Sequence, residues 1–343
     1  MSAASPIEGY EDWPATAWGT ARRRVGMPRA DAVAAAIGVP VPPTAVAPRV
    51  VDRVEADGLE VTALAWPAGY GPETRAFLLR PAGERGILPG VLALHAHGGQ
   101  FATGALQLVR ADPWTEPAHD AFRDRYFDGL AAANDLARRG FAVLAHDAFL
   151  WDSRRARRSR VERSPQTEET ISKAAGMLGT TLAGMVAHDD LVAFDVLAGL
   201  PGVDADRIGA FGFSGGGGRA WLLASLEPRL RAVVQSGMTA TFDSLVPDYL
   251  DSHSWLLFAP GLRQVAEWPL VVDPAGGAHA LVQADTADPL FPADGVRDAV
   301  RMLRAAWSPD RLRVAVRDVG HVCDAEMQAE AWAFLAERLG AGT

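Results

Sequence analysis

One serine stands in a setting that could do chemistry. Ser214 lies at the centre of Gly212-Phe213-Ser214-Gly215-Gly216, a G-x-S-x-G pattern that directly follows the apolar run RIGAFGF. If that run is a buried strand and a helix follows, the serine occupies a sharp turn and its hydroxyl projects above the sheet as a nucleophile. The alternative is a glycine-rich phosphate loop, but GGGGRAW has no lysine of the P-loop kind.

A serine nucleophile needs a general base, and a histidine is the usual one. His321 follows Ser214 in RVAVRDVGHVCD, a loop expected between the last strand and the last helix, and we predict that it is the base. His253 lies in an irregular segment and His279 begins an apolar run, so neither is preferred. A surface histidine that caps the last helix is the alternative interpretation of His321.

The base in turn needs an orienting carboxylate, which in the chain order Ser, Asp, His follows the strand before the histidine. The segment ALVQADTADPLFP offers Asp285 and Asp288. Asp285 still belongs to the strand end, whereas Asp288 lies in the turn before Pro289, from which a carboxylate can reach His321. We predict Asp288 as the acid; an Asx turn or a helix cap is the alternative role for either aspartate.

Acyl transfer also needs N–H groups that stabilise the oxyanion of the tetrahedral intermediate. The residue after the nucleophile, Gly215, can supply one from its backbone. The other should come from HAHGGQF, the loop after an earlier apolar run, where Gly98 and Gly99 let the backbone approach a substrate carbonyl. We predict Gly99 as the second donor, with Gln100 as the next choice.

Metal and cofactor chemistry is not expected. His95 and His97 resemble a ligand pair, but a spacing of two on a strand would direct their side chains to opposite faces. Cys323 is the only cysteine, which excludes an intrachain disulfide and a multi-cysteine metal site, and we expect it to be packed in the core. Asp189 and Asp190 are expected to form helix caps or salt bridges, and the arginine-rich stretch 151–163 a solvated loop.

The elements that would position these residues alternate along the chain. Short apolar runs predict strands, most of them buried on both faces, and segments of helical spacing lie between them, which is the pattern of a parallel sheet with crossover helices. An antiparallel hairpin over 50–81 opens the series, and the irregular stretches 151–180 and 238–278 are candidate pocket walls. The strands are predicted at 90–96, 141–147, 207–213, 231–237, 279–285 and 311–318, and the helices at 123–139, 181–200, 217–226, 295–307 and 326–339. The predicted fold class is α/β, a doubly wound and mostly parallel sheet.

Composition and charge narrow the class of protein. The 343 residues are 49% hydrophobic with a formal net charge of −9, which argues against a partner that is nucleic acid or an anionic membrane. The start of the chain is not typical of a signal peptide, and no run of eighteen apolar residues follows, so we expect a cytoplasmic enzyme. We predict a helical appendage and Pro-rich linker over 1–48, with a helix near Arg29–Ile37, and a catalytic domain over 49–343.

With these pieces in order, the chain over residues 50–340 resembles the dienelactone-hydrolase-like and acetyl-xylan-esterase-like branch of the α/β-hydrolase superfamily. The matching segments are LPGVLALHAHGG, YFDGLAAANDLARRGFAVLAHDA, LPGVDADRIGAFGFSGGGG, QADTADPLFP and DVGH. The resemblance implies the α/β-hydrolase fold and a serine esterase. Ser214 stands where dienelactone hydrolase has a cysteine, Ala96 where relatives often have glycine, and Asp285 where glycine is common, so substrate specificity does not carry over.

The sequence therefore predicts a serine hydrolase that cleaves a carboxylic ester through an acyl-enzyme, with Ser214, His321 and Asp288 as triad and Gly215 and Gly99 as oxyanion donors. No cofactor or metal is required, and the partner is a small-molecule ester; a homo-oligomer stays open. Amide, peptide or carbon–carbon bond cleavage by the same triad is one alternative, and a non-catalytic binding module on a hydrolase fold is another.

Overall fold

The computed structural model describes residues 29–42, 46–156 and 165–341. Within these residues, nine strands form one sheet in the order β1-β2-β3-β5-β4-β6-β7-β8-β9. Pairing is antiparallel from β1 to β5 and parallel from β5 onward. The strands are β1 (Arg49–Ala56), β2 (Leu59–Trp66), β3 (Thr74–Pro81), β4 (Leu88–Leu94), β5 (Ala142–His146), β6 (Val203–Phe213), β7 (Ala232–Ser236), β8 (His279–Asp285) and β9 (Leu312–Arg317).

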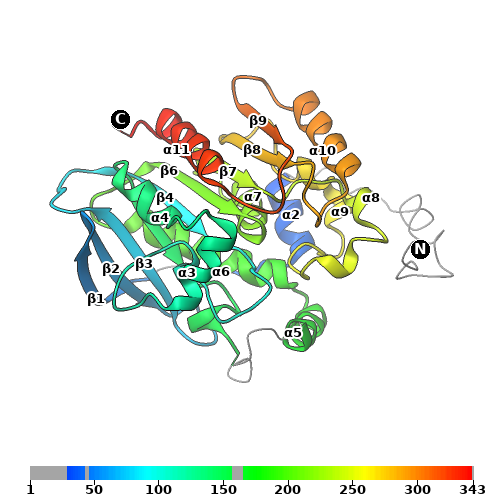
Figure 1. Ribbon diagram of the computed structural model, residues 1–343. Coiled ribbons are helices and arrows are strands. Elements are labelled where there is room, and N and C mark those ends of the chain that lie inside the picture. The colour runs from blue at the N-terminus through cyan, green and yellow to red at the C-terminus, as the bar shows by residue number, and fades with distance from the viewer. Residues whose placement is uncertain (1–28, 43–45, 157–164, 342–343) are drawn as a thin grey trace.

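Helices cover both faces of this sheet (Figure 1). One apolar core lies between the sheet and the helices α2, α6, α7 and α10, and a second lies between the opposite face and α3, α4 and α11. The bounds are α2 (Arg29–Ile37), α3 (Pro117–Tyr126), α4 (Ala132–Arg138), α5 (Pro165–Met177), α6 (Leu182–Gly199), α7 (Gly215–Leu226), α8 (Phe242–Leu245), α9 (Leu262–Val265), α10 (Ala293–Ala306) and α11 (Ala325–Leu339). This two-sided cover confirms the predicted doubly wound, mostly parallel α/β sheet.

The central strands are apolar because both of their faces are buried. In β4, Leu92 and Leu94 belong to the first core, whereas Val91 and Ala93 belong to the second. Side chains on a strand alternate between faces, so a strand with helices on both sides reads as an unbroken apolar run. The parallel strands run in the same direction, and their carboxyl ends meet at one edge of the sheet, where ligands bind in such folds.

The predicted helix over 123–139 is two helices in the structure. α3 ends at Tyr126, and α4 begins at Ala132. Between them the backbone of Asp128 and Gly129 takes positive φ values of 51° and 73°, which no right-handed helix can contain. The single predicted helix was therefore wrong, although both pieces pack on the same face of the sheet.

Of the predicted N-terminal appendage, residues 1–28 and 43–45 lie outside the described residues, as does the part of the arginine-rich stretch over 157–163. The helix expected near Arg29–Ile37 is present as α2, and it contacts α6, α7 and α9. Its Val33 and Ile37 are fully buried in the first core. No helix among the described residues combines the length and the apolar character that crossing a membrane requires.

Candidate active site

Ser214 occupies the turn between β6 and α7, as the sequence predicted. Its backbone has φ 55° and ψ −128°, a conformation that is strained for a residue with a side chain. The turn is tight enough that a Cβ on Gly212 would collide with the carbonyl oxygen of Gly216, and a Cβ on Gly216 would collide with that of Leu94. Only glycine fits at 212 and 216, which explains the spacing of the motif.

His321 and Asp288 meet Ser214 at the same edge of the sheet. The Nε2 atom of His321 lies 2.8 Å from Ser214 Oγ, and its Nδ1 atom lies 2.6 Å from Asp288 Oδ2. The other carboxylate oxygen of Asp288 accepts a hydrogen bond of 2.9 Å from the Leu290 N–H. The carboxylate thus orients the imidazole, whose free nitrogen faces the serine hydroxyl. The structure brings together all three residues that we predicted as a triad.

Asp285 and His253, which the sequence analysis did not prefer, lie near the three residues of the triad but are not part of it. Asp285 ends β8 and is buried, and neither of its carboxyl oxygens has a hydrogen-bond partner among the described residues. Burial, aided by repulsion from Asp288, raises its pKa to about 7. The ring of His253 donates to the Leu290 carbonyl oxygen at 2.9 Å, and burial lowers its pKa to about 4, so this histidine is neutral at pH 7.

The loop after β4 does not present Gly99 as predicted. The Gly99 N–H donates to Nδ1 of His97 at 3.0 Å, so it is not free for a substrate oxygen. By contrast, a Cβ placed on Gly215 would lie 2.9 Å from the backbone nitrogen of His97. Among the described residues neither the His97 N–H nor the Gly215 N–H has a recorded partner. The backbone of His97 therefore lies beside Gly215, next to Ser214, whereas the Gly99 N–H is already used within the loop.

The sequence analysis selected Gly99 rather than His97 because glycine allows the backbone to bend towards a substrate. Gly98 and Gly99 do have positive φ values, of 68° and 67°. That bend serves to fold the loop back so that the Gly99 N–H meets the His97 ring, rather than to expose the Gly99 N–H. Furthermore, β4 ends at Leu94, so His97 is in the loop and the strand argument about ligand pairs did not apply to it.

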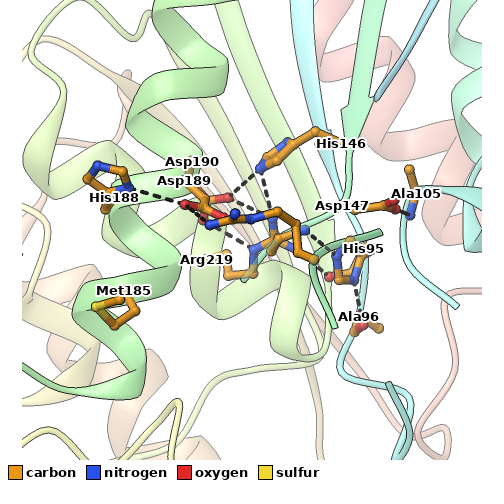
Figure 2. Close-up of polar contacts among 12 residues, drawn as sticks. His95, Ala96, Ala105, His146, Asp147, Met185, His188, Asp189, Asp190 and Arg219 are labelled. Carbon is orange, nitrogen blue, oxygen red and sulfur yellow. Dashed lines mark hydrogen bonds and ion pairs between the residues drawn. The ribbon is translucent and has the colours of Figure 1, made fainter. Parts of the chain in front are cut away.

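A buried charge cluster fixes the start of this loop (Figure 2). Arg219 of α7 pairs with Asp190 of α6 through two contacts of 2.6 and 3.1 Å, and both side chains are 2% exposed. A further guanidinium N–H donates to the carbonyl oxygen of His95 at 3.0 Å. Burial alone would raise the pKa of Asp190, but the charge of Arg219 outweighs it and lowers the pKa to about 2. The aspartate forms a salt bridge, as the sequence analysis allowed, but its partner lies on a neighbouring helix rather than on a loop.

The His95 ring continues the same cluster. Its Nδ1 donates to the Ala96 carbonyl oxygen at 2.9 Å, and its Nε2 accepts the Ala148 N–H at 3.3 Å. Complete burial, with the positive charge of Arg219, lowers the pKa of His95 well below its usual value. A neutral ring with one donor and one acceptor satisfies both contacts. His95 is therefore a structural residue that holds the backbone between β4 and His97.

A cavity of about 350 Å³ opens over Ser214. One part of its wall comes from the loop after β4, another from α3 and a third from the two irregular stretches that were predicted as pocket walls. Aromatic and aliphatic side chains dominate, with polar groups contributed by the segment 251–254. The lining includes Phe101, Phe122, Tyr126, Glu168, Met238, Asp251, His253, Leu256, Leu257 and Leu290. A site of this size, apolar with a few polar groups, suits a small organic substrate.

Cys323 is fully buried, and burial raises the pKa of its thiol, which makes it a core residue and no second nucleophile. In the described ranges, no three His, Cys, Asp or Glu side chains gather as a metal ion would require.

Known proteins resemble the chain in sequence and in fold. Residues 127–241 match the model of the Dienelactone hydrolase family. YtaP of Bacillus subtilis (strain 168), whose own assignment as a hydrolase is provisional, is 28% identical over 265 residues, which are 76% of this chain and 82% of YtaP.

Solved structures share the fold over nearly the whole chain. Acetyl Xylan Esterase 1 from Thermoanaerobacterium sp. JW/SL YS485 has a TM-score of 0.60 at 16% identity and covers 93% of this chain and 95% of its own. Glucuronoyl esterase from Solibacter usitatus has a TM-score of 0.62 at 14% identity and covers 94% of each chain. Residues 127–241 thus resemble the Dienelactone hydrolase family, the chain shares the fold of these esterases, and these findings support a hydrolase.

Proposed function

We propose that the protein is a serine esterase that cleaves a small carboxylic ester through an acyl-enzyme. The observation that carries this proposal is the hydrogen-bonded row from Asp288 through His321 to Ser214, with contacts of 2.6 and 2.8 Å at the floor of a cavity. A nucleophile, a base and an orienting acid in this order form the constellation that catalyses acyl transfer.

In the first half of the reaction, the hydroxyl oxygen of Ser214 attacks the ester carbonyl while Nε2 of His321 takes its proton. Asp288 accepts the Nδ1–H bond throughout and stabilises the imidazolium that forms. Collapse of the tetrahedral intermediate breaks the ester C–O bond, and His321 gives its proton to the departing alkoxide oxygen. Water then repeats the sequence on the acyl-serine and releases the carboxylic acid.

The N–H groups of Gly215 and His97 are the proposed oxyanion donors. Both groups lie next to Ser214 and lack partners among the described residues, so they are free to receive the negative oxygen. Gly215 is also the first residue of α7, where the helix dipole favours a negative charge. One such donor contributes on the order of 10²–10³ in kcat.

Esters are preferred over amides and carbon–carbon bonds because the named structural neighbours are esterases, although the fold alone does not select the bond. The deciding experiment is a matched panel in which one acyl group is presented as an aryl ester, as an anilide and as a diketone. The proposal predicts that the ester has the highest kcat/KM and that Ser214→Ala abolishes its turnover. Faster anilide or diketone cleavage would shift the assignment to the corresponding alternative.

A further inference from the structure

Glu168 of α5 reaches the active site from a different part of the fold than the triad does. It is 7% exposed, lines the cavity, and accepts three hydrogen bonds. Oε1 accepts from the Ser254 hydroxyl at 2.5 Å and from the Trp255 N–H at 2.7 Å, and Oε2 lies 3.0 Å from Nε2 of His97. One carboxylate therefore joins both pocket-forming stretches to the loop that carries an oxyanion donor.

The hydrogen bonds around His97 determine which nitrogen of its ring holds the proton. Nδ1 accepts the Gly99 N–H at 3.0 Å, so in the neutral ring the proton is on Nε2 and is donated to Glu168. The ring also packs against Phe101 and Trp151, with centroids 5.5 and 5.1 Å away. The indole N–H of Trp151 donates to the His97 carbonyl oxygen at 3.1 Å. Ring and backbone of His97 are thus held together.

We propose that Glu168 is a positioning residue that sets the tautomer of His97 and so keeps the His97 N–H aligned beside Gly215 as an oxyanion donor. This inference rests on the proposed function, because it assumes that the reaction develops an oxyanion. Glu168 itself has no contact with Ser214, His321 or the reacting carbonyl in this account, and it acts through His97 alone.

The chemistry of the contacts requires a carboxylate at this position. All three partners of Glu168 are donors, namely a hydroxyl, a backbone N–H and an imidazole N–H, and an ionised carboxylate accepts from all of them. Burial raises the pKa of Glu168, but the hydrogen bonds from His97, Ser254 and Trp255 together with the charge effect of His97 outweigh it and lower the pKa overall. The group is therefore ionised at neutral pH.

Glutamine cannot satisfy the same set of partners. Its amide offers one acceptor oxygen, and its NH2 group would face a donor at either end. If the NH2 group faces His97, the ring must move its proton to Nδ1, where it then opposes the Gly99 N–H. The opposite orientation would set the NH2 group against the Trp255 N–H, which can only donate, so we expect the amide oxygen to face Trp255 and the NH2 group to face His97. Glu168→Gln therefore disturbs the proposed oxyanion loop with little change in side-chain volume.

The first arm of the test reads the tautomer directly and needs no substrate. In a two-bond ¹H–¹⁵N spectrum of ¹⁵N-histidine-labelled protein, His97 is expected as the Nε2–H tautomer, with its signals assigned from their loss in His97→Gln. Glu168→Gln should shift His97 to the Nδ1–H form or to an exchanging mixture. An unchanged Nε2–H tautomer in the variant would overturn the proposal, whether or not the protein hydrolyses esters.

The second arm measures kcat and KM for an aryl ester in the same variant. Because small misplacements of catalytic groups reduce rates steeply, Glu168→Gln should lower kcat by about 10–100-fold and change KM by less than about threefold. Glu169→Gln is the matched control, since Glu169 is the next residue of the same helix and pairs with Lys173 at the surface. It should retain wild-type kcat and KM. A Glu168→Gln enzyme with normal kcat and a raised KM would mean that Glu168 is only a pocket wall, which contradicts the proposal.

Discussion

The imidazole of His321 lies 2.8 Å from the hydroxyl of Ser214, although 107 residues of chain separate them. The contact exists because β6 and β9 both end at the same edge of the sheet. Between them lies β8, two strand positions from β6 and next to β9, and the turn after β8 carries Asp288. Each catalytic candidate therefore depends on the register of a different strand, and each can be tested separately.

Replacement of each aspartate by asparagine should show that Asp288, and not its neighbour Asp285, is the acid of the triad. Asp288→Asn removes the carboxylate that orients His321, and kcat should fall by about 10⁴-fold, as expected when the imidazole is left in the wrong tautomer. Asp285→Asn, three residues earlier, should retain most of the activity because its oxygens do not contact His321 in the structure. Steady-state kinetics on an aryl ester would decide, and a larger loss from Asp285→Asn than from Asp288→Asn would reverse the assignment.

The buried carboxyl of Asp285 should make stability depend on pH. Its pKa is about 7 in the folded protein and near 3.8 when unfolded, so folding disfavours its ionisation. The contribution of Asp285 to the free energy of unfolding is therefore most favourable below pH 4, where the carboxyl is protonated in both states. This contribution decreases as pH rises from about 4 to 7 and is lost completely above pH 7. Asp285→Asn removes this penalty.

At roughly 1.4 kcal/mol per pKa unit, the variant should gain on the order of 2–4 kcal/mol of unfolding free energy at pH 8 and almost nothing near pH 4. Urea denaturation at both pH values measures this difference. Asp294→Asn, which changes an exposed carboxylate on α10, is the control and should show no such dependence. Equal effects of Asp285→Asn at both pH values would refute the explanation.

Adding one methyl group at Gly215 should damage catalysis more than folding. The Cβ of Gly215→Ala would lie 2.9 Å from the His97 nitrogen, so the two proposed oxyanion donors are forced apart. We expect kcat to fall by about 10²-fold or more, as when one oxyanion donor is lost. Gly199→Ala, at an exposed helical position with open space around the new Cβ, should leave kcat unchanged. Wild-type turnover by Gly215→Ala would exclude the proposed pair of donors.

The buried pair of Asp190 and Arg219 should be costly to break. Asp190→Asn leaves the guanidinium of Arg219 without its partner in the core, which typically costs about 3–5 kcal/mol. The exposed pair of Asp298 and Arg301 provides the comparison, and Asp298→Asn should cost less than about 1 kcal/mol. Chemical denaturation of both variants checks this ranking. Similar losses of unfolding free energy would show that burial does not determine how much the pair of Asp190 and Arg219 stabilises the fold.

Much of the fold could be predicted because the central strands are buried on both faces. The run HALVQAD predicts β8 with the bounds that the structure has, because every residue in it except the partly exposed His279 is buried. The break between α3 and α4 could not be predicted, because it depends on a positive φ at Asp128. Aspartate is a residue type that many helices contain, so its presence does not indicate a break. Local patterns predict elements well and predict special backbone angles poorly.

The candidate site also contains residues that could be predicted from the sequence and residues that could not. Ser214, Asp288 and His321 each follow a strand, so the order of the strands along the chain leads to them. The proposed positioning role of Glu168 leaves no local sequence pattern, because its partner His97 is 71 residues away and belongs to another part of the fold. A hydrogen bond within a loop is equally hard to predict. The N–H of Gly99 donates to the side chain of His97, two residues earlier, and this contact leaves no pattern in the sequence.

Covalent labelling by a fluorophosphonate, followed by mass spectrometry of the digested protein, tests whether Ser214 is the nucleophile. An activated serine displaces the fluoride, so we expect a single phosphonylated peptide with the adduct on Ser214. The labelling should disappear in Ser214→Ala and slow strongly in His321→Ala, while both variants keep the wild-type circular dichroism. Wild-type protein that stays unlabelled, or carries the adduct at another residue, would contradict the account.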